Sequence, residues 1–281
     1  MSVFEPMVDS CQKKKCFNFS PSRISDYQQC PALYKYRAID KLVERPGVDA
    51  LRGSLVHLIL EKIFKNAPSD RDFTKAVSLT NECWQELVRL EPELICALDE
   101  KIPFPLTESV EISQERLDVL FEEVKTLIAN YYALEDPSRI QPKSTEELIE
   151  FDLSDDLKIK GYVDRIDESP QGWLRINDYK TGKSPKENFS SKAMFQLKFY
   201  ALVIFKSTKE IPKLLRLIYL KDSQILTYEP TEQELDLTLK KVEAVASQIQ
   251  RSKETNEWPT NITKLCDYCY FKSICPAFTK P

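Results

Sequence analysis

Residues 159–183, IKGYVDRIDESPQGWLRINDYKTGK, read as two β-strands joined by a turn. Both halves contain strand-forming residues with a period of two, and residues 169–172 (SPQG) are typical of a turn. Residues two apart in a strand share a face, so we expect Asp178 and Lys180 to project together, while Tyr179 points away and leaves its backbone carbonyl nearby. The second strand therefore predicts a carboxylate and an ammonium group directed at one spot.

The register of this hairpin decides whether a second carboxylate, Asp164, joins the first. A two-residue loop at positions 170 and 171 would pair position 164 with position 177, which places Asp164 and Asp178 on opposite faces. A shared site needs a loop of odd length or a β-bulge, and we predict one of these. Two carboxylates that converge in this way offer the oxygen ligands that Mg²⁺ or Mn²⁺ needs.

Such an arrangement is suited to hydrolysis of a phosphodiester. A divalent ion lowers the pKa of bound water and neutralises charge that develops on a phosphate, while a nearby lysine positions or activates the attacking water. Taken one at a time, however, charged residues at strand ends are usually solvated and have no such role. Other parts of the sequence are needed to distinguish a catalytic site from solvated strand ends.

Length and composition narrow the class of protein. The chain has 281 residues, of which 42% are hydrophobic, and can bury a sizeable core. No stretch approaches the roughly 20 apolar residues that cross a bilayer, and the first residues lack the apolar core of a secretion signal, so we expect a cytoplasmic protein without a membrane partner. The net charge of −4 gives no support by itself to nucleic-acid binding. The absence of a G-x-x-x-x-G-K-[ST] sequence argues against a P-loop motor in this chain.

The hydrophobic period predicts an α/β domain with a mixed central sheet, flanking helices and a helical insert. Helices are expected over 51–64, 72–90, 108–132, 188–205 and 231–251, the last opened by a capping box of Thr231 and Glu234. Further strands are expected over 147–153, 214–222 and 224–230. We therefore expect a flexible tail over 1–16 and a single domain over 17–281, with a helical region at about 51–135, the sheet at about 145–230 and a C-terminal helix and cysteine cluster at about 231–281.

Cysteine spacing predicts a metal centre near the C-terminus. Cys266, Cys269 and Cys275 follow a C-x2-C-x5-C pattern, which brings three sulfurs within reach of one centre. Cys30 is our choice for the fourth ligand, because a proline follows it, as one follows Cys275, in a similar aromatic and basic context. Four thiolates suit either structural zinc or a 4Fe-4S cluster, and spacing does not choose between them.

The remaining cysteines are weaker candidates. Cys11 and Cys16 lie in the predicted tail, and either could replace Cys30 as the distant ligand. Cys83 and Cys96 fall within helical patterns, where free cysteine usually behaves as a small core residue.

The segments GYVDRID and DYKTGK resemble motifs II and III of the PD-(D/E)XK nucleases, in particular of the RecB-like branch. The similarity extends from SPSRISDYQQCPALYKY through RGSLVHLILE to QLKFY and the terminal cysteines. Within this branch the chain is most similar to the AddB nuclease domain and to CRISPR-associated iron-sulfur exonucleases. The resemblance implies a restriction-endonuclease-like core, in which Cys30, Cys266, Cys269 and Cys275 hold a 4Fe-4S cluster that staples the N- and C-terminal segments together.

The resemblance also implies roles for individual residues of the site. His57 corresponds to a metal ligand, although a lone histidine on an apolar helix is more often a core residue. The other implied positions are the metal-binding acids Asp164 and Asp178, the Tyr179 carbonyl as a backbone ligand, the catalytic lysine Lys180, and Gln196 and Tyr200 of a Q-x3-Y motif.

Some positions stay open at this stage. Gln196 and Tyr200, four residues apart, share a helix face and could reach the lysine and the DNA backbone, but without the resemblance they would read as a polar rim. An acid from the preceding strand often contributes in this branch, and either Glu147 or Glu150 could supply it, while Glu61 could be an exposed helix residue. Basic residues that could follow a phosphate backbone are Arg23, Lys35, Arg37, Arg165, Lys183, Lys186, Lys192 and Lys198.

We therefore expect a Mg²⁺- or Mn²⁺-dependent DNA exonuclease that acts in repair or recombination on single-stranded or frayed ends, with a helicase as a possible partner. Two alternatives remain. One is a DNA-binding accessory factor without catalytic activity, and the other is a zinc-stapled binding module. Within the enzyme class, an endonuclease or a flap-specific activity also stays open. The sequence leaves digestion polarity, strand preference and oligomeric state open.

Overall fold

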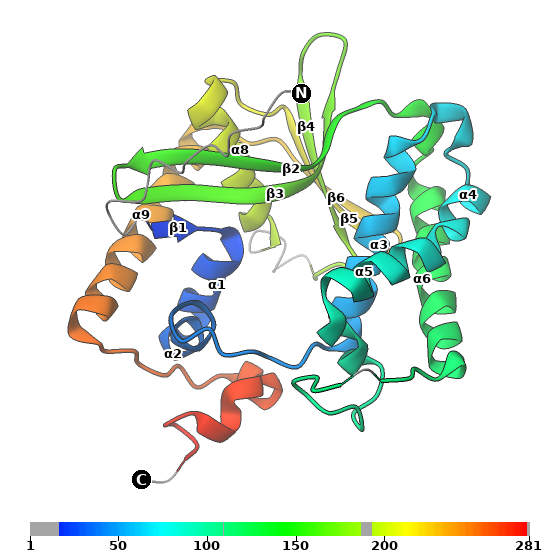
Figure 1. Ribbon diagram of the computed structural model, residues 1–281. Helices are drawn as coiled ribbons and strands as arrows, with labels where there is room; N and C mark the ends of the chain where they lie inside the picture. Colours follow the sequence, from blue (N-terminus) through cyan, green and yellow to red (C-terminus); the bar gives the residue numbers. More distant parts are fainter. Residues whose placement is uncertain (1–16, 109, 187–192, 280–281) are drawn as a thin grey trace, which may run out of the picture.

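The computed structural model describes residues 17–108, 110–186 and 193–279. A central sheet lies between two groups of helices (Figure 1). The predicted tail over 1–16, with Cys11 and Cys16, lies outside the described residues, and so does Lys192. No helix in the described part of the chain combines the length and the apolar character needed to span a bilayer.

The sheet has six strands and is mixed, as predicted. Its strands are β1 (Phe17–Phe19), β2 (Pro142–Ser154), β3 (Leu157–Glu168), β4 (Leu174–Lys180), β5 (Leu214–Tyr219) and β6 (Gln224–Tyr228). The strand order is β1-β3-β4-β5-β6, and β2 pairs with β3 in addition. Strands β1 and β3 are parallel, as are β4 and β5, whereas the β2–β3, β3–β4 and β5–β6 pairs are antiparallel.

The helices fall in the predicted regions with some differences in extent. They are α1 (Pro21–Gln29), α2 (Pro31–Tyr34), α3 (Val48–Lys65), α4 (Phe73–Ser78), α5 (Thr80–Leu90), α6 (Gln114–Leu134), α8 (Phe195–Thr208) and α9 (Glu232–Thr255). The helix expected over 72–90 is divided into α4 and α5 at Leu79. The capping box of Thr231 and Glu234 opens α9 as expected.

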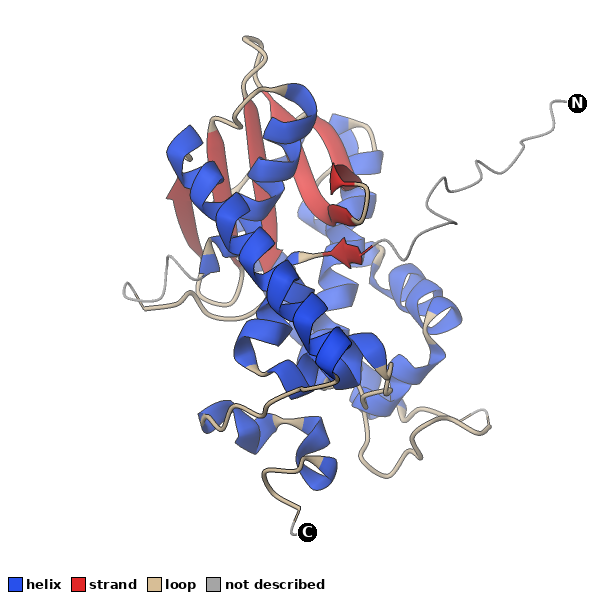
Figure 2. Ribbon diagram, turned by 90° about the vertical axis from the view of Figure 1, so that its left-hand side faces the viewer, coloured by secondary structure: helices blue, strands red, loops and turns tan. Residues whose placement is uncertain are grey.

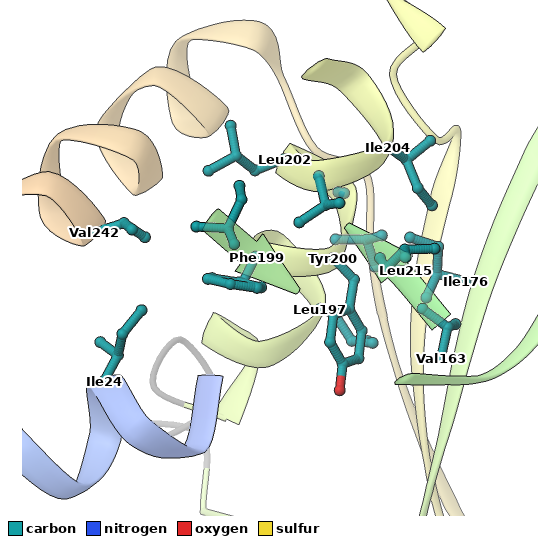
Figure 3. Packing of buried hydrophobic residues seen from close by; sticks show 14 of the residues in the cluster. Ile24, Val163, Ile176, Leu197, Phe199, Tyr200, Leu202, Ile204, Leu215 and Val242 are labelled. Carbon is teal, nitrogen blue, oxygen red and sulfur yellow. The ribbon is translucent and has the colours of Figure 1, made fainter. Parts of the chain in front are cut away.

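Helix α8 is the centre of the first core. Its middle part, Phe199–Ile204, is buried continuously, which is typical of a helix covered on several sides. Leu197 and Leu202, both fully buried, lie with Val163, Ile176 and other side chains between the sheet and the surrounding helices (Figure 3). Seen from the side, helices cover the strands in front and behind (Figure 2).

The second core covers the other face of the sheet and is built on α3. Leu51, Leu55, Ile59 and Ile63 are spaced by four residues and are fully buried. They pack with side chains of α5 and α6 and with Tyr179 of β4. Complete burial of one such aliphatic side chain contributes roughly 1.5–3 kcal/mol, so this stripe fixes α3 firmly beside the sheet.

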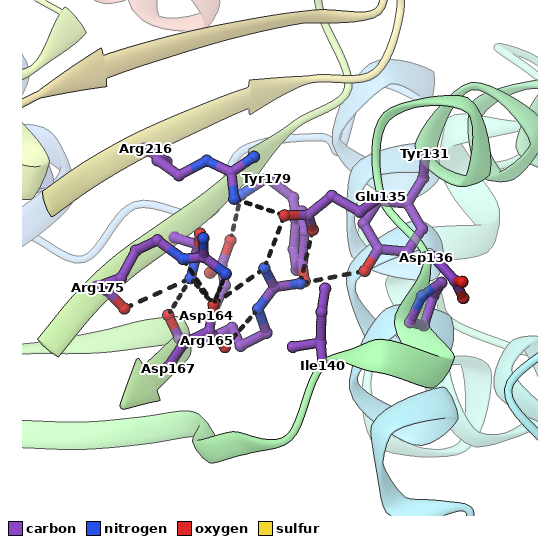
Figure 4. A network of polar contacts seen from close by, with 12 residues as sticks. Tyr131, Glu135, Asp136, Ile140, Asp164, Arg165, Asp167, Arg175, Tyr179 and Arg216 are labelled. Carbon is purple, nitrogen blue, oxygen red and sulfur yellow. Dashed lines mark hydrogen bonds and ion pairs between the residues drawn. The ribbon is translucent and has the colours of Figure 1, made fainter. Parts of the chain in front are cut away.

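Arg165 joins α6 to the sheet from inside this second core (Figure 4). Its side chain is 0% exposed, lies 2.9 Å from a carboxylate oxygen of Glu135 and 3.0 Å from one of Asp167, and donates to the Tyr179 hydroxyl at 2.7 Å. The prediction that Arg165 follows a DNA backbone is therefore wrong, because a guanidinium enclosed by carboxylates and tyrosines cannot reach a phosphate in solvent. Arg216 contacts the same Glu135 at 2.6 Å.

Candidate active site

The hairpin of β3 and β4 has the register that a shared site requires. Arg165 pairs with Asn177, so the same register sets Asp164 opposite Asp178. The loop between Glu168 and Leu174 has five residues, and the Ser169 N–H closes it by donating to the Trp173 carbonyl at 2.9 Å. Gly172 supplies the positive φ of 83° that this loop needs. The prediction of an odd-length loop is confirmed.

Asp164 stands where β3 passes from one core to the other. Val163 packs in the first core, whereas Arg165 contacts Tyr131 and Tyr179 of the second. Both cores therefore hold the backbone around Asp164, and its carboxylate faces neither of them. Its Oδ2 atom accepts the Tyr179 N–H at 2.7 Å and lies 3.4 Å from Nδ1 of His57.

His57 comes from α3 and lies against β4. Its Nε2 atom lies 3.0 Å from the Tyr179 carbonyl oxygen, to which the ring donates. The side chain is 29% exposed, although α3 buries most of its apolar residues completely. Gly53, His57 and Glu61 follow at intervals of four and line one pocket at the surface. The interpretation of His57 as an ordinary core residue therefore does not fit its position.

The structure adds an acid that sequence reasoning missed. Glu146 offers a carboxylate oxygen that lies, with one atom each of His57 and Asp164, in a group whose members are all within 4.8 Å of one another. Glu146 has a positive φ of 48° in β2, which is unusual for a residue other than glycine. Its neighbours in the ladder, Thr145 and Glu147, pair with Arg165 and Val163, so Glu146 stands opposite Asp164.

Neither acid proposed from the sequence belongs to this group. Glu147 accepts a hydrogen bond from the Ser144 hydroxyl, and Glu150 forms an ion pair with Lys158 at 2.9 Å. The signal that distinguishes Glu146 is its place opposite Asp164. That signal depends on the pairing of β2 with β3, which the sequence alone does not supply.

Burial and mutual repulsion raise the pKa values of the clustered acids. Burial, followed by the charge of Asp164, raises the pKa of Glu146 to about 7. The same two causes raise the pKa of Asp178 to about 6. Burial opposes the charged form of His57, but the Asp164 carboxylate prevails and raises its pKa to about 9. A group of acids that cannot all ionise comfortably is suited to a positive partner, and a divalent cation is such a partner.

Lys180 lies on the other side of Asp178 and is held at two points. Its Nζ atom is 2.6 Å from Oδ2 of Asp178 and donates to Oε1 of Gln196 at 2.8 Å. Gln196 in turn donates to the Tyr200 hydroxyl at 2.8 Å. Burial opposes the charged form of Lys180, but the carboxylate of Asp178 outweighs it and raises the lysine pKa. The lysine is therefore a fixed positive charge, and Gln196 and Tyr200 position it.

Gly161 explains why Tyr200 can lie so close to β3. A Cβ atom at position 161 would meet Cε1 of Tyr200 at 2.5 Å, which is far closer than van der Waals contact. The glycine thus leaves room for the tyrosine ring beside the strand. This close approach explains why a glycine opens the segment GYVDRID.

The four cysteines selected from the sequence line a single pocket. Cys30 lies between α1 and α2, and Cys266, Cys269 and Cys275 lie in or beside two short 3₁₀ helices, Lys264–Tyr268 and Tyr270–Ile274. All four are free thiols, and no three of their sulfurs lie within 4.8 Å of one another. Cys83 and Cys96 are buried core residues, as predicted.

Most of the basic residues considered for DNA binding already have partners. Lys35 forms an ion pair with Asp40, Arg37 with Asp26 and Glu44, and Lys198 with Glu234. Lys183 and Lys186 are exposed in the loop after β4. The Ser184 hydroxyl anchors this loop by donating to Asp222 at 2.7 Å.

A mixed sheet with facing aspartates and a lysine at the end of one hairpin is the core arrangement of a nuclease superfamily. The model of the PD-(D/E)XK nuclease superfamily matches residues 18–276. The chain belongs to this superfamily.

Two phage proteins are similar over much of their length. The gene 69 protein of Mycobacterium phage D29 is 26% identical over 276 residues, which cover 92% of this chain and 96% of the relative. The gene 69 protein of Mycobacterium phage L5 is 27% identical over 214 residues, which cover 66% of this chain and 69% of the relative. Neither name states an activity.

One solved structure shares the fold. It is a protein of Eubacterium rectale that is named as an exonuclease by inference, with a TM-score of 0.57 and 15% sequence identity. The alignment covers 95% of this chain and 93% of that protein. At this identity the likeness shows the fold alone.

Proposed function

We propose that the protein is a metal-dependent DNA exonuclease of the RecB-like type. One observation carries the proposal: Asp164 stands opposite Asp178, and Nζ of Lys180 lies 2.6 Å from Asp178 at the end of the same hairpin. Membership of a nuclease superfamily supports hydrolysis of DNA. The name of the Eubacterium rectale protein favours an exonuclease over an endonuclease.

The donor set fits a divalent cation such as Mg²⁺ or Mn²⁺. The groups that would hold it are His57, Glu146, Asp164, Asp178 and the Tyr179 carbonyl. These are mainly oxygen ligands, which hard cations prefer, and the raised pKa values of Glu146 and Asp178 reflect burial and the nearby charge of Asp164. When bound, the ion would neutralise charge on the phosphate and lower the pKa of a bound water.

The protein groups around this site hold the reacting phosphate and water in place. Lys180 carries its charge toward the developing negative charge, and a positioned donor of this kind contributes about 10²–10³ to the rate. Gln196 fixes the ammonium group on the side away from Asp178, and Tyr200 fixes Gln196. Lys183 and Lys186 offer exposed charge for the phosphates that follow.

The substrate we propose is single-stranded DNA or a frayed end. The sequence has no P-loop for a motor, so a helicase partner is the natural source of unwound strands, and repair or recombination is the natural setting. We place the protein in the cytoplasm, where the free thiols near the C-terminus would remain reduced.

We place a 4Fe-4S cluster at the cysteine pocket, with zinc as the alternative. Sets of four cysteines hold either centre, and the four free thiols of this pocket come from both ends of the domain. The resemblance of the chain to iron-sulfur exonucleases favours the cluster. The proposed cluster would reinforce contacts that join the two ends of the domain, such as the hydrogen bond from Nδ2 of Asn261 to the Gln29 carbonyl at 2.8 Å.

The test is digestion of end-labelled linear and circular single-stranded DNA with Mg²⁺ or Mn²⁺, using anaerobically purified protein. We expect the wild type to degrade linear but not circular DNA, and Lys180→Ala to lower the rate by about 10²–10³. Lys240→Ala, which removes an exposed lysine from α9, is the matched control and should leave the rate unchanged. A folded, brown wild type without activity would instead favour a DNA-binding accessory factor.

A further inference from the structure

We propose that Tyr162 is a stacking platform for a base of single-stranded DNA next to the reacting phosphate. This inference rests on the proposed nuclease function and adds a binding subsite to it. Tyr162 precedes Asp164 by two residues in β3 and lines one surface pocket with His57 and Glu146, the two residues that cluster with Asp164. The ring is therefore next to the proposed metal ligands.

Tyr162 lines two neighbouring pockets, one on each side of the site. The first pocket contains Gln196 and Tyr200 of α8 together with serines of α1, and the second contains His57 and Glu146. A DNA strand that passes from one pocket to the other crosses the proposed metal ligands and also Gln196 and Tyr200, which hold Lys180. Tyr162 lines both pockets, so the DNA strand would also cross its ring.

The ring of Tyr162 is free to receive a base. It is 59% exposed, and no hydrogen bond or ring contact to another described residue involves it. Tyr131 and Tyr179, by contrast, meet edge to face and contact Arg165. An isolated exposed aromatic residue is common on protein surfaces and has no meaning by itself. Tyr162 differs from such residues because it lies between two pockets and close to the proposed metal ligands.

The neighbours of Tyr162 suit a nucleotide. Leu148, its partner across the β2–β3 ladder, is 44% exposed and extends the apolar surface. Lys160 lies two residues away on the same side of β3, and within the described part of the chain it has no ion-pair partner. Strand β3 therefore presents a cation and an aromatic ring about 6.7 Å apart on one side, and the ring borders the pocket of His57 and Glu146. A backbone phosphate would meet Lys160, a base would meet Tyr162, and the reacting phosphate would lie beyond the ring.

This arrangement selects unpaired DNA. A base inside a duplex has both of its faces covered by neighbouring base pairs, and unstacking it costs free energy. A single strand offers a free face to the tyrosine, and base–aromatic stacking tolerates any sequence. The subsite would thus favour a single-stranded or frayed terminus without reading the bases.

The experiment combines three proteins with a series of oligonucleotides. Wild type, Tyr162→Phe and Tyr162→Ala are compared on single-stranded substrates in which one abasic nucleotide is moved along the chain. Cleavage is measured with Mn²⁺, and binding is measured separately by fluorescence anisotropy with Ca²⁺. Thermal melts of all three proteins establish that the substitutions at this exposed position leave the fold intact.

We expect Tyr162→Phe to retain the wild-type kcat/KM within about twofold and Tyr162→Ala to lose about fivefold to 150-fold. One abasic position should weaken the wild type by a similar factor and have no further effect on Tyr162→Ala. Cleavage with a flat abasic profile, or equal values for the alanine and phenylalanine variants, would overturn the stacking role. Binding with the expected abasic profile but without cleavage would support the subsite and count against the nuclease, and absence of both would overturn the subsite as well.

Discussion

The backbone N–H of Tyr179 donates to Oδ2 of Asp164 at 2.7 Å, across the hairpin. This hydrogen bond fixes the rotation of the Asp164 carboxylate and also brings the Tyr179 carbonyl to the side of His57, which it meets at 3.0 Å. Tyr179 of β4 thus orients Asp164 through its backbone N–H and accepts a hydrogen bond from His57 through its carbonyl. Main-chain groups of β4 therefore arrange these candidate ligands before any ion binds.

Glu146→Gln is expected to stabilise the metal-free protein at high pH. The folded protein holds the Glu146 proton more tightly than the unfolded chain, because its pKa is raised to about 7 from 4.5. The corresponding stability is present below the unfolded pKa and is lost as the pH rises through about 7, whereas glutamine avoids this loss. Thermal melts of the metal-free protein should therefore favour the variant at about pH 8 and not at about pH 4.

The same variant should lose metal stabilisation. Mn²⁺ is expected to raise the melting temperature of the wild type and to raise that of Glu146→Gln much less, because a ligand is missing. Glu147→Gln, which changes the adjacent acid outside the group, should respond to Mn²⁺ like the wild type. Equal Mn²⁺ shifts in the two variants would contradict a metal site at Glu146.

Glu135→Gln is expected to lower the unfolding free energy by about 1.5–3 kcal/mol, because it removes one of the two carboxylates that pair with the buried charge of Arg165 and leaves only Asp167. Burial disfavours the Glu135 carboxylate, but Arg165 prevails and lowers its pKa. The contribution is therefore present above the unfolded pKa and is lost as the pH falls through the folded one, so the wild type and the variant should converge in acid. Urea unfolding at neutral and acidic pH measures this difference.

A matched control lies on the same helix. Glu122→Gln removes an acid of α6 that is 71% exposed and forms a surface ion pair with Lys125, so its effect should stay within about 0.5 kcal/mol. If the two variants of α6 are equally stable, the buried network does not hold the helix to the sheet.

Gly161→Ala is expected to destabilise the protein by about 1–3 kcal/mol, because the new methyl group would overlap the Tyr200 ring. Displacement of Tyr200 should also lower nuclease activity, since Gln196 would lose its support. Gly182→Ala is the control, because a Cβ atom there has no neighbour within 4 Å among the described residues. A Gly161→Ala protein with wild-type stability and rate would show that the ring moves aside freely.

Cys30→Ala is expected to remove the visible absorbance of an iron-sulfur cluster and to lower the melting temperature. Cys83→Ala is the control, because this buried thiol lies in the core away from the cysteine pocket. Iron, sulfide and zinc analysis of the purified protein separates the two possible centres. A colourless protein with one zinc per chain would contradict the cluster.

Local patterns predicted those parts of the site that lie close together in the sequence. The period of two in β4 was enough to place Asp178 and Lys180 on one face. The requirement that Asp164 share this face predicted the odd-length loop. Cys30 required more, namely a similarity of context to Cys275, and the structure places both at one pocket.

What local patterns could not supply was tertiary pairing. Glu146 was missed because its position depends on the register of β2 against β3, and its positive φ breaks the regular alternation of the strand. Arg165 was misassigned because its partner Glu135 comes from α6, which is distant in the sequence. In both cases the chemistry of the residue was visible, but the side chain it would meet was not.

The ends of the loop after β3, and not its length, fix the two halves of the site. Leu174 and Ile176 of β4 are buried in one core and Tyr179 in the other, so a slip of β4 by one residue would turn all of these side chains, and Asp178 with them, to the wrong face. A change in loop length that keeps Glu168 opposite Leu174 leaves Asp164 and Asp178 facing each other. Positions 169–173 can therefore gain or lose residues during evolution while the two cores keep the site assembled.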